Sequence, residues 1–421
     1  MLFRSLKMNK NVLLPKSATN IYVSISGLFG LFIALTIIKL LNPFNDNPVY
    51  SALFLIMCFS IFVALLDIFW QKVFANRSSG LDFKYKNPSI SRSFTKIIGF
   101  LGSLSLLALL YWVFPEYHGD FYAPFCEAVN FVLPALVCIA PFYIYLIDRH
   151  MLEPADGYWY LGLFLTFRFS QIDYKKLWQH ILGWIVKGFF LPLMFVYMSN
   201  DIKTFIAFDF QEKISFQALL NSLSDFLFFI DVTIATAGYI VSLRITDTHI
   251  RSTEPTVMGW VVALICYQPF YSLIGGQYLD YHRDYSWNDW LENGSLIYYA
   301  WGSLEVFMVF VYAWATVSFG LRFSNLTNRG IITSGPYRWT KHPAYLAKNI
   351  SWWMLSVPFI ADGAYSEAIR NCILLGLLNF CYYLRARTEE KHLSADQNYI
   401  NYSHWIAENG IIAKIKRVFT K

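Results

Sequence analysis

Long apolar runs separated by short polar connections recur along the whole 421-residue chain. A helix needs about 20 mostly apolar residues to cross the hydrocarbon core of a bilayer. Ten runs reach or approach that length, and we expect each to form a membrane-spanning helix. The ten runs are 21–41, 50–69, 97–114, 123–147, 177–198, 219–243, 258–276, 297–320, 345–361 and 368–384. The last two are short and close together, which predicts a helical hairpin.

Composition agrees with an all-α integral membrane protein. Apolar residues make up 56% of the chain and charged residues only 15%, whereas a soluble domain carries roughly a quarter charged residues. This excludes a disordered scaffold, a disulfide-stapled secreted module and an ordinary cytosolic enzyme. The segment 158–169 is apolar and aromatic but too short to span, so we expect it in the membrane interface.

The formal net charge of +6 matters through its location, because Lys and Arg in loops set membrane orientation. Basic residues concentrate in the N-terminal segment and in every second connection, whereas the intervening connections are poor in them. The basic groups are Arg4, Lys7, Lys10 and Lys16; Lys72, Arg77, Lys84, Lys86, Arg92 and Lys96; Arg149, Arg168, Lys175 and Lys176; Arg244 and Arg251; and Arg322, Arg329, Arg338 and Lys341, against Arg283 alone in the seventh connection. The alternation predicts a multi-pass protein of an inner or plasma membrane or the endoplasmic reticulum, with both termini cytoplasmic.

The eight histidines are scattered, and the six cysteines contain no C-x-x-C pair. The pattern predicts no bound metal, because membrane di-iron chemistry needs clustered histidines and zinc sites need closely spaced ligands. We expect no nucleic-acid partner either. The expected partners are membrane lipids and a lipophilic substrate.

The most informative stretch precedes the ninth run and has the sequence GPYRWTKHPAY over residues 335–345. Each proline biases the residue before it away from helix, so Gly-Pro and His-Pro predict an irregular turn at the membrane surface. That turn presents phenols, cations and an imidazole in a compact segment whose backbone N–H groups are available to a ligand. These side chains are Tyr337, Arg338, Lys341, His342 and Tyr345.

A second polar stretch, RARTEEKH over residues 385–392, continues the last run into the cytoplasm. Arg385 and Glu389 are spaced i, i+4 and Arg387 and Glu390 are spaced i, i+3, so each pair can share a helix face. The hairpin returns this helix to the side where His342 lies. Taken singly, such residues are common interface anchors or surface pairs. Together they predict one site at the cytoplasmic membrane edge.

The two stretches resemble the motifs of the isoprenylcysteine carboxyl methyltransferase and phospholipid methyltransferase family of integral membrane enzymes. That family's pattern is G-P-Y-R-x-x-R-H-P-x-Y-x-G, a helical hairpin, R-x-x-E-E and an amphipathic tail containing tyrosine. Here the tail is DQNYINY over residues 396–402, and the resemblance covers about residues 321–412. It implies S-adenosylmethionine held between the His-Pro turn and the end of the last helix, with a lipophilic acceptor entering from the bilayer.

The resemblance also implies roles for individual residues. Tyr337, Arg338, His342 and Tyr345 would contact the cofactor, with Glu389 or Glu390 on its ribose hydroxyls or amino group. Arg385 or Arg387 would orient the acceptor and are the expected catalytic residues. Two departures from the pattern are Lys341 in place of Arg and Ala347 in place of Gly. Lys348 and Asn349 then add polarity inside the expected span.

A division at residue 296 follows: residues 1–296 are expected to form a transmembrane scaffold and substrate cavity, and residues 297–421 a methyltransferase-like domain.

Three other interpretations stay open. Membrane sterol reductases share the H-P-x-Y turn, have about ten spans and use NADPH, but they typically differ at the positions of Ala344, Ala347 and Lys348. A non-enzymatic transporter or assembly factor would need no cofactor, and a degenerate methyltransferase would bind the cofactor without turnover.

Overall fold

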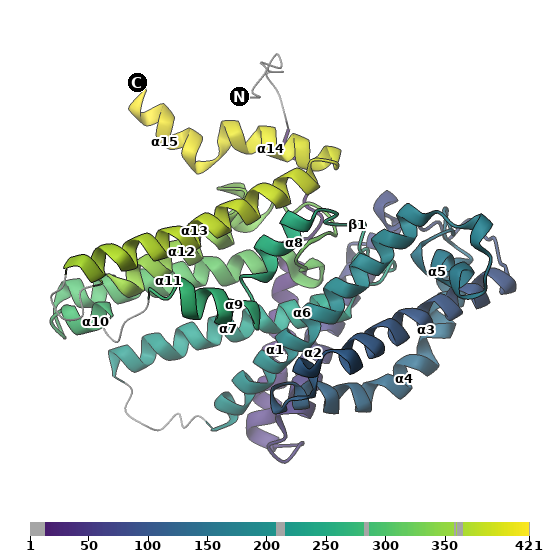
Figure 1. Ribbon diagram of the computed structural model, residues 1–421, viewed down its shortest axis with the longest axis horizontal. Coiled ribbons are helices and arrows are strands. Elements are labelled where there is room, and N and C mark those ends of the chain that lie inside the picture. The colour runs from purple at the N-terminus through teal and green to yellow at the C-terminus, as the bar shows by residue number, and fades with distance from the viewer. Residues whose placement is uncertain (1–12, 208–214, 282–285, 358, 360–364, 421) are drawn as a thin grey trace. The chain divides into compact units, whose positions relative to one another are not determined.

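A computed structural model describes residues 13–207, 215–281, 286–357, 359 and 365–420, and Figure 1 shows its helices. Arg4, Lys7, Lys10 and Arg283, which entered the orientation argument, lie outside the described residues. Almost all of the regular structure is helical, and the described part contains one short antiparallel pair, β1 (Ser252–Thr253) with β2 (Thr327–Asn328). The predicted all-α class is confirmed.

Seven helices within the described residues are long and apolar enough to cross a membrane. They correspond to the first six predicted runs and to the eighth. The predicted count of ten spans is therefore not confirmed, while the integral membrane character of the chain is.

The chain divides into two compact units, and each is described by itself. Unit 2 comprises Tyr22–Asp280 and Phe319–Arg329. Its α-helices are α1 (Ile21–Leu41), α2 (Pro48–Leu65), α3 (Ile90–Val113), α4 (Ala123–Asp148), α5 (Gly157–Leu165), α6 (Tyr174–Ala207), α7 (Phe216–Ile240), α8 (Val257–Leu264) and α9 (Phe270–Leu273). Its shorter turns are η1 (Leu66–Trp70), η2 (Val73–Ala75), η3 (Arg77–Ser79), η4 (Pro115–His118), η5 (Asp120–Tyr122), η6 (Phe169–Gln171), η7 (Ile274–Tyr278) and η8 (Gly320–Arg322).

Close helix packing inside unit 2 depends on small residues. A Cβ atom on Gly99 of α3 would stand 1.9 Å from the carbonyl oxygen of Tyr158, and one on Gly162 of α5 would stand 2.0 Å from the carbonyl oxygen of Thr95. The backbones of α3 and α5 can therefore touch, as small residues allow in membrane helices. Short α5 is the segment expected in the interface, and it packs along α3.

The basic connections of unit 2 meet one another. Leu81 forms a bridge with Met151, and Asp82 N donates to His150 O at 2.9 Å, which joins the second connection to the fourth. Arg251 N donates to Asn328 O at 2.9 Å, which joins the sixth to the eighth. The second, fourth, sixth and eighth connections thus share contacts pairwise, as alternation predicts. The side of the membrane that they face stays a prediction.

Unit 1 comprises Met1–Ile21, Tyr281–Ser318 and Gly330–Lys421. Its elements are α10 (Trp287–Trp290), α11 (Leu296–Phe319), η9 (Gly335–Arg338), α12 (Pro343–Ser356), α13 (Tyr365–Leu393), α14 (Gln397–Asn409) and α15 (Ile411–Phe419). Helices α12 and α13 run antiparallel, because Trp353 near the end of α12 donates to Asn379 at 2.7 Å, whereas Tyr345 at its start donates to Glu389, further along α13, at 2.9 Å. This is the predicted hairpin.

Three predicted spans differ from the structure, and residues 358, 360 and 361 of the predicted run 345–361 lie outside the described residues. The run 258–276 is not one helix, since α8 ends at Leu264 and only α9 and a π-helix (Ile274–Tyr278) follow. Pro269 explains the break: it lacks an N–H donor and disfavours helix at the residue before it. In the hairpin, α12 has 14 residues, which is too short to cross the hydrocarbon alone, whereas α13 has 29 residues and extends past the expected end at Leu384.

Candidate functional site

The Gly-Pro turn is built as the sequence predicts and is fixed by the tail helix. Gly335 has a left-handed φ of +60° and starts the 3₁₀ turn η9, a conformation that favours glycine. The hydroxyl of Tyr402 in α14 donates to Tyr337 O at 2.6 Å and to Thr340 O at 3.3 Å. Ile411 N donates to Trp339 O at 2.8 Å. The tail therefore holds the carbonyl groups of the turn from one side.

The turn ends at His342, which directly precedes α12, with Pro343 as the first helical residue. Proline suits this position because its missing N–H group has no helical acceptor to lose. Residues of α13 meet the turn here. His342 Nε2 lies 3.2 Å from Glu390 Oε1, and Lys341 Nζ lies 3.3 Å from the same oxygen. The His-Pro turn and the end of the last long helix, 48 residues apart in sequence, thus form one cluster.

Glu389 and Glu390 have different surroundings. Glu390 is 20% exposed, and its other oxygen lies 3.5 Å from Arg387 NH1. Glu389 is 41% exposed, and its Oε2 accepts the hydroxyl hydrogen of Tyr345 at 2.9 Å and lies 3.9 Å from His342 Nδ1. Glu390 is therefore held by three cationic or donor side chains, whereas Glu389 keeps more of its carboxylate open to solvent.

Aromatic rings extend the cluster along the hairpin. The rings of His342 and Tyr345 stack with centroids 5.4 Å apart and an interplanar angle of 4°. The guanidinium carbon of buried Arg385 lies 5.0 Å from the centroid of Tyr345 and 5.9 Å from that of Tyr382. Such placements stabilise a cation by the quadrupole of the ring. Arg385 therefore contacts the rings of the site directly.

Lys348 lies one helical turn beyond Tyr345 and is surrounded by rings. Its Nζ is 5.1 Å from the Trp352 centroid, 5.5 Å from that of Tyr312 and 5.9 Å from that of Tyr382. The polarity that the sequence places inside this segment is thus accommodated by cation–π contacts. Lys348 and Arg385 both lie 5.9 Å from the centroid of the Tyr382 ring.

The predicted site residues differ in their contacts and in their exposure to solvent. His342, Tyr345, Glu389, Glu390 and Arg387 are joined by the contacts above, and the predicted Arg387–Glu390 pair is confirmed. The side chain of Arg338 is exposed, and that of Tyr337 is buried. The contribution of Tyr337 to the geometry is its carbonyl oxygen, held by Tyr402. Ala347 is also buried, at 3% exposure.

Electrostatics favour an ionised Glu390. Burial acts to raise the pKa of its carboxyl, but the hydrogen bond with His342 and the charge of Lys341 outweigh burial and hold that pKa below the ordinary value. The pKa values of Tyr399 and Tyr402 are raised by burial first and by the nearby Glu390 second. Tyr402 therefore remains a neutral hydroxyl donor to the turn.

From the sequence alone, Tyr312 and Tyr382 have no expected role in this region, and Tyr402 enters only as part of the tail motif. The tyrosine-containing tail is part of the motif, so Tyr402 could have been found from it. Tyr312 and Tyr382 lie in apolar helices, where a core role and a site role leave the same sequence pattern. Lys348 was noticed for its polarity, but nothing in the sequence places three rings around it.

The side chains of the cluster are suited to binding a particular class of ligand. It combines a partly exposed carboxylate, an imidazole, a phenol and cations above aromatic rings, which suits a ligand with hydroxyl or amino donors and an acidic group. Within the ranges that the structure describes, no three His, Cys, Asp or Glu side chains gather in a way that could hold a metal ion.

Comparisons with known proteins agree with the location of this cluster. No curated protein and no solved structure matches the chain. Residues 301–395, less than a quarter of the chain, match the model of the isoprenylcysteine carboxyl methyltransferase (ICMT) family. The matched segment contains the His-Pro turn, α12 and all of α13. The C-terminal part of this membrane protein is thus similar to the isoprenylcysteine carboxyl methyltransferase family.

Proposed function

We propose that the chain is an integral membrane methyltransferase that transfers a methyl group from S-adenosylmethionine to a lipophilic acceptor at the cytoplasmic face. The observation that carries the proposal is the cluster that His342 and Tyr345 form with Glu389 and Glu390 inside the segment matched by the family. The matched family is one of methyltransferases. The long apolar helices are suited to a bilayer, from which a lipid-like acceptor can enter.

The donor set of the cluster fits S-adenosylmethionine, which presents ribose hydroxyls, an amino group, a carboxylate and an aromatic base. Glu389 fits the hydroxyl or amino donors better than Glu390, because the oxygens of Glu390 already face Lys341, His342 and Arg387. The stacked rings of His342 and Tyr345 offer an aromatic surface. We therefore assign Glu389, His342 and Tyr345 to the cofactor.

When bound, S-adenosylmethionine supplies an electrophilic methyl group on a positively charged sulfur. An acceptor carboxylate or thiolate would donate the electron pair of the new bond while the pair of the C–S bond stays with sulfur, so that the protein would need no base to remove a proton. The protein's task is then alignment and exclusion of water. Arg385 and Arg387 are proposed to orient the acceptor, and a guanidinium holds a carboxylate in a bidentate manner.

The rigid turn contributes to that alignment. Tyr402 and the Ile411 N–H group fix the carbonyls of residues 337–340, so that Lys341 and His342 are presented at the same place against α13. Buried Arg385, stacked on Tyr345, is proposed to set the position of that phenol relative to Glu389.

The test uses detergent-purified full-length protein with methyl-labelled S-adenosylmethionine and an extract of membrane lipids that includes prenylated cysteine compounds. We expect label in the lipid phase, with transfer lowered about 10- to 100-fold in Glu389→Gln, as for a lost charge-assisted hydrogen bond. Glu367→Gln, at the other end of α13, is the matched control and should keep wild-type transfer. NADPH binding is measured in parallel.

Two results would overturn the proposal. The first is a lipid phase that never acquires label although S-adenosylmethionine and acceptors are present. The second is saturable NADPH binding that is lost in His342→Ala, without any S-adenosylmethionine binding, which would place the chain with the membrane reductases.

A further inference from the structure

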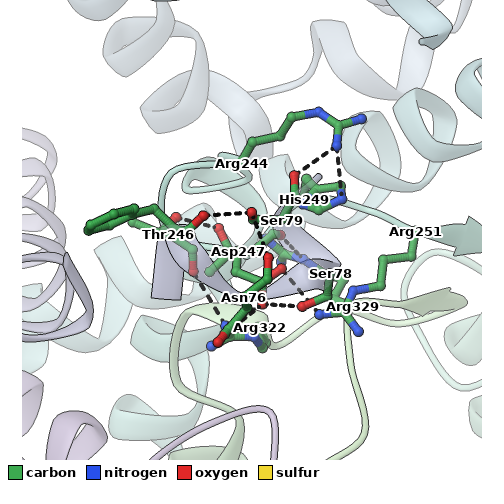
Figure 2. Close-up of polar contacts among 12 residues, drawn as sticks. Asn76, Ser78, Ser79, Arg244, Thr246, Asp247, His249, Arg251, Arg322 and Arg329 are labelled. Atoms are coloured by element: carbon green, nitrogen blue, oxygen red, sulfur yellow. Dashed lines mark hydrogen bonds and ion pairs between the residues drawn. The ribbon is translucent and has the colours of Figure 1, made fainter. Parts of the chain in front are cut away.

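A second charged cluster, which we call the Asp247 cluster, lies in unit 2 and is independent of the proposed function (Figure 2). Asp247 is 1% exposed and has a left-handed φ of +52°. Its Oδ2 accepts from Ser78 Oγ at 2.6 Å and from Asn76 Nδ2 at 3.2 Å. Arg251 NH2 lies 3.2 Å from Oδ1, and Arg322 NH2 lies 3.6 Å from Oδ2. One carboxylate thus joins three connections of the unit.

Two more arginines lie at this cluster. Arg244 NH1 donates to Ser79 O at 3.1 Å and lies 3.4 Å from His249 Nε2. Arg329 is fully buried and donates to four backbone carbonyls, those of Thr248, Gly238, Phe323 and Val241, at 2.6–2.9 Å. Two of these carbonyls belong to the C-terminal end of α7, so Arg329 acts as a helix cap there. Its N–H groups are used by the fold.

Charge is not balanced in this cluster. The cations are Arg244, Arg251, Arg322 and Arg329, and the anions are Asp247 and buried Asp67, which acts electrostatically on Arg322. Four positive charges against two negative ones leave a formal excess of two. Buried charges are costly unless they are paired. Buried Glu254, three residues after Arg251, adds one more carboxylate to this part of the unit, and counting it still leaves one positive charge in excess, which a further anion would balance.

Another buried charged cluster of the same unit shows what balance looks like. Lys96, 2% exposed, lies 2.8 Å from Asp148 and 3.2 Å from Asp156, and Arg92 lies 2.9 Å from Asp148. Two cations there meet two carboxylates. The excess positive charge is thus a property of the Asp247 cluster and does not follow from burial in this unit.

Three buried donors of the Asp247 cluster lack an acceptor among the residues that the structure describes: Arg251 Nε, Arg322 Nε and His249 Nδ1. Arg322 is 2% exposed. The guanidinium of Arg244 can only donate, so His249 Nε2 must be its acceptor and the ring proton must lie on Nδ1. Burial and the four arginines lower the pKa of His249 well below its ordinary value, which keeps the ring neutral.

We propose that the Asp247 cluster binds a phosphoryl group, with Arg251, Arg322 and His249 as its donors. A phosphoryl group supplies the missing negative charge and several acceptor oxygens, and guanidinium groups pair with it in a bidentate manner. Solvent reaches the cluster at Arg251, whose side chain is 22% exposed, and Asn76 and Ser78 are exposed beside it. The phosphoryl group can belong to a lipid headgroup or to a soluble phosphate.

The experiment measures the thermal unfolding midpoint of the full-length protein in neutral detergent at constant salt. The probes are inorganic phosphate and phosphatidic acid in mixed micelles, with diacylglycerol of the same acyl chains as the uncharged counterpart. A ligand that binds only the folded state raises the midpoint in a saturable way. We expect phosphatidic acid, inorganic phosphate or both to do so, and diacylglycerol to have no effect.

Variants locate the effect. Arg251→Gln should weaken apparent affinity about tenfold or more, while Arg77→Gln, which changes an exposed arginine of the second connection, should leave it unchanged. Arg251→Lys keeps the charge beside Asp247 but removes the Nε donor, so it should fold and still bind more weakly.

Stabilisation by inorganic phosphate, with or without phosphatidic acid, indicates a soluble phosphate ligand, and stabilisation by phosphatidic acid alone indicates a lipid headgroup. Either result supports the site. The proposal is overturned if neither probe raises the midpoint, if diacylglycerol acts as strongly as phosphatidic acid, or if Arg251→Lys and Arg251→Gln bind as the wild type does.

Discussion

The two charged clusters of this protein are built in opposite ways. At the end of α13, the carboxylates of Glu389 and Glu390 are 41% and 20% exposed, and cations of the His-Pro turn approach them from outside. In unit 2, Asp247 is 1% exposed and arginines outnumber the carboxylates around it. A half-exposed carboxylate exchanges protein partners for a ligand at small cost, whereas a buried one cannot be changed without leaving its partners unpaired.

The first prediction separates these two designs by stability. Asp247→Asn should lower the free energy of unfolding by about 3–5 kcal/mol, because Arg251 and Arg322 lose a buried counter-charge. Asparagine tolerates the left-handed φ of +52° at this position, so the substitution tests charge and not backbone strain. Chemical denaturation in detergent measures the effect.

The matched variant is Glu389→Gln, which changes a carboxylate of the exposed cluster in the same way. Its free energy of unfolding should fall by less than about 1 kcal/mol, as for exposed ion pairs. Equal losses in the two variants would contradict the comparison and would mean that Glu389 carries structural weight that its exposure does not indicate.

Much of the exposed cluster could be predicted from the sequence, because its geometry is local. His-Pro at the start of one helix and an R-x-R-x-E-E stretch at the end of the next must meet if the two helices form a hairpin. The contacts His342–Glu390 and Tyr345–Glu389 follow from that topology. The sequence could not distinguish Glu389 from Glu390, since adjacent residues differ only in what the partner turn presents to each.

The Asp247 cluster could not be predicted in this way. Its members come from connections separated by more than 160 residues, as in the Ser78–Asp247 hydrogen bond, and each arginine alone matches an ordinary basic loop residue. Basic alternation indicated that these loops share a side, but it carries no information on burial. The broken run 258–276 was missed for a related reason: apolar composition hides the effect of Pro269 on helix continuity.

The second prediction addresses how rigidly the exposed cluster is held. Tyr402→Phe removes the hydroxyl that donates to Tyr337 O and Thr340 O and leaves these carbonyls without that donor. We expect a loss of about 1–3 kcal/mol in the free energy of unfolding. Amide hydrogen exchange should rise in residues 335–342 and 397–411 together, since the tail and the turn hold each other.

Tyr399→Phe is the control for that variant, because its hydroxyl is buried without a hydrogen-bond partner among the described residues. Removing it should cost little. If Tyr402→Phe left exchange in the turn unchanged, the turn would be held by its own prolines and Gly335, and the tail would be only an attachment.

The third prediction is the smallest and concerns acid. The pKa of Glu390 is held below its ordinary value of 4.5 in the folded protein by His342 and Lys341. A carboxyl with a depressed pKa contributes stability that is present above pH 4.5 and is lost as the pH falls through the folded-state pKa. The difference in free energy of unfolding between wild type and Glu390→Gln should therefore be constant from pH 7 to about pH 5 and shrink below that, by a few tenths of a kcal/mol in this partly exposed cluster.

Lys341→Gln sharpens the same measurement, because Lys341 is one of the groups that lower the pKa of Glu390. Without that charge the folded-state pKa rises toward 4.5, so the total acid-induced loss of stability should be smaller than in the wild type and should be complete at a higher pH. A loss of unchanged size would mean that the hydrogen bond with His342, and not the charge of Lys341, holds the carboxylate ionised. Lys341 could then pair with an acidic group of the ligand without changing the ionisation of Glu390. Lys341 would be the side chain that exchanges a protein partner for a ligand, which no side chain of the buried Asp247 cluster can do at small cost.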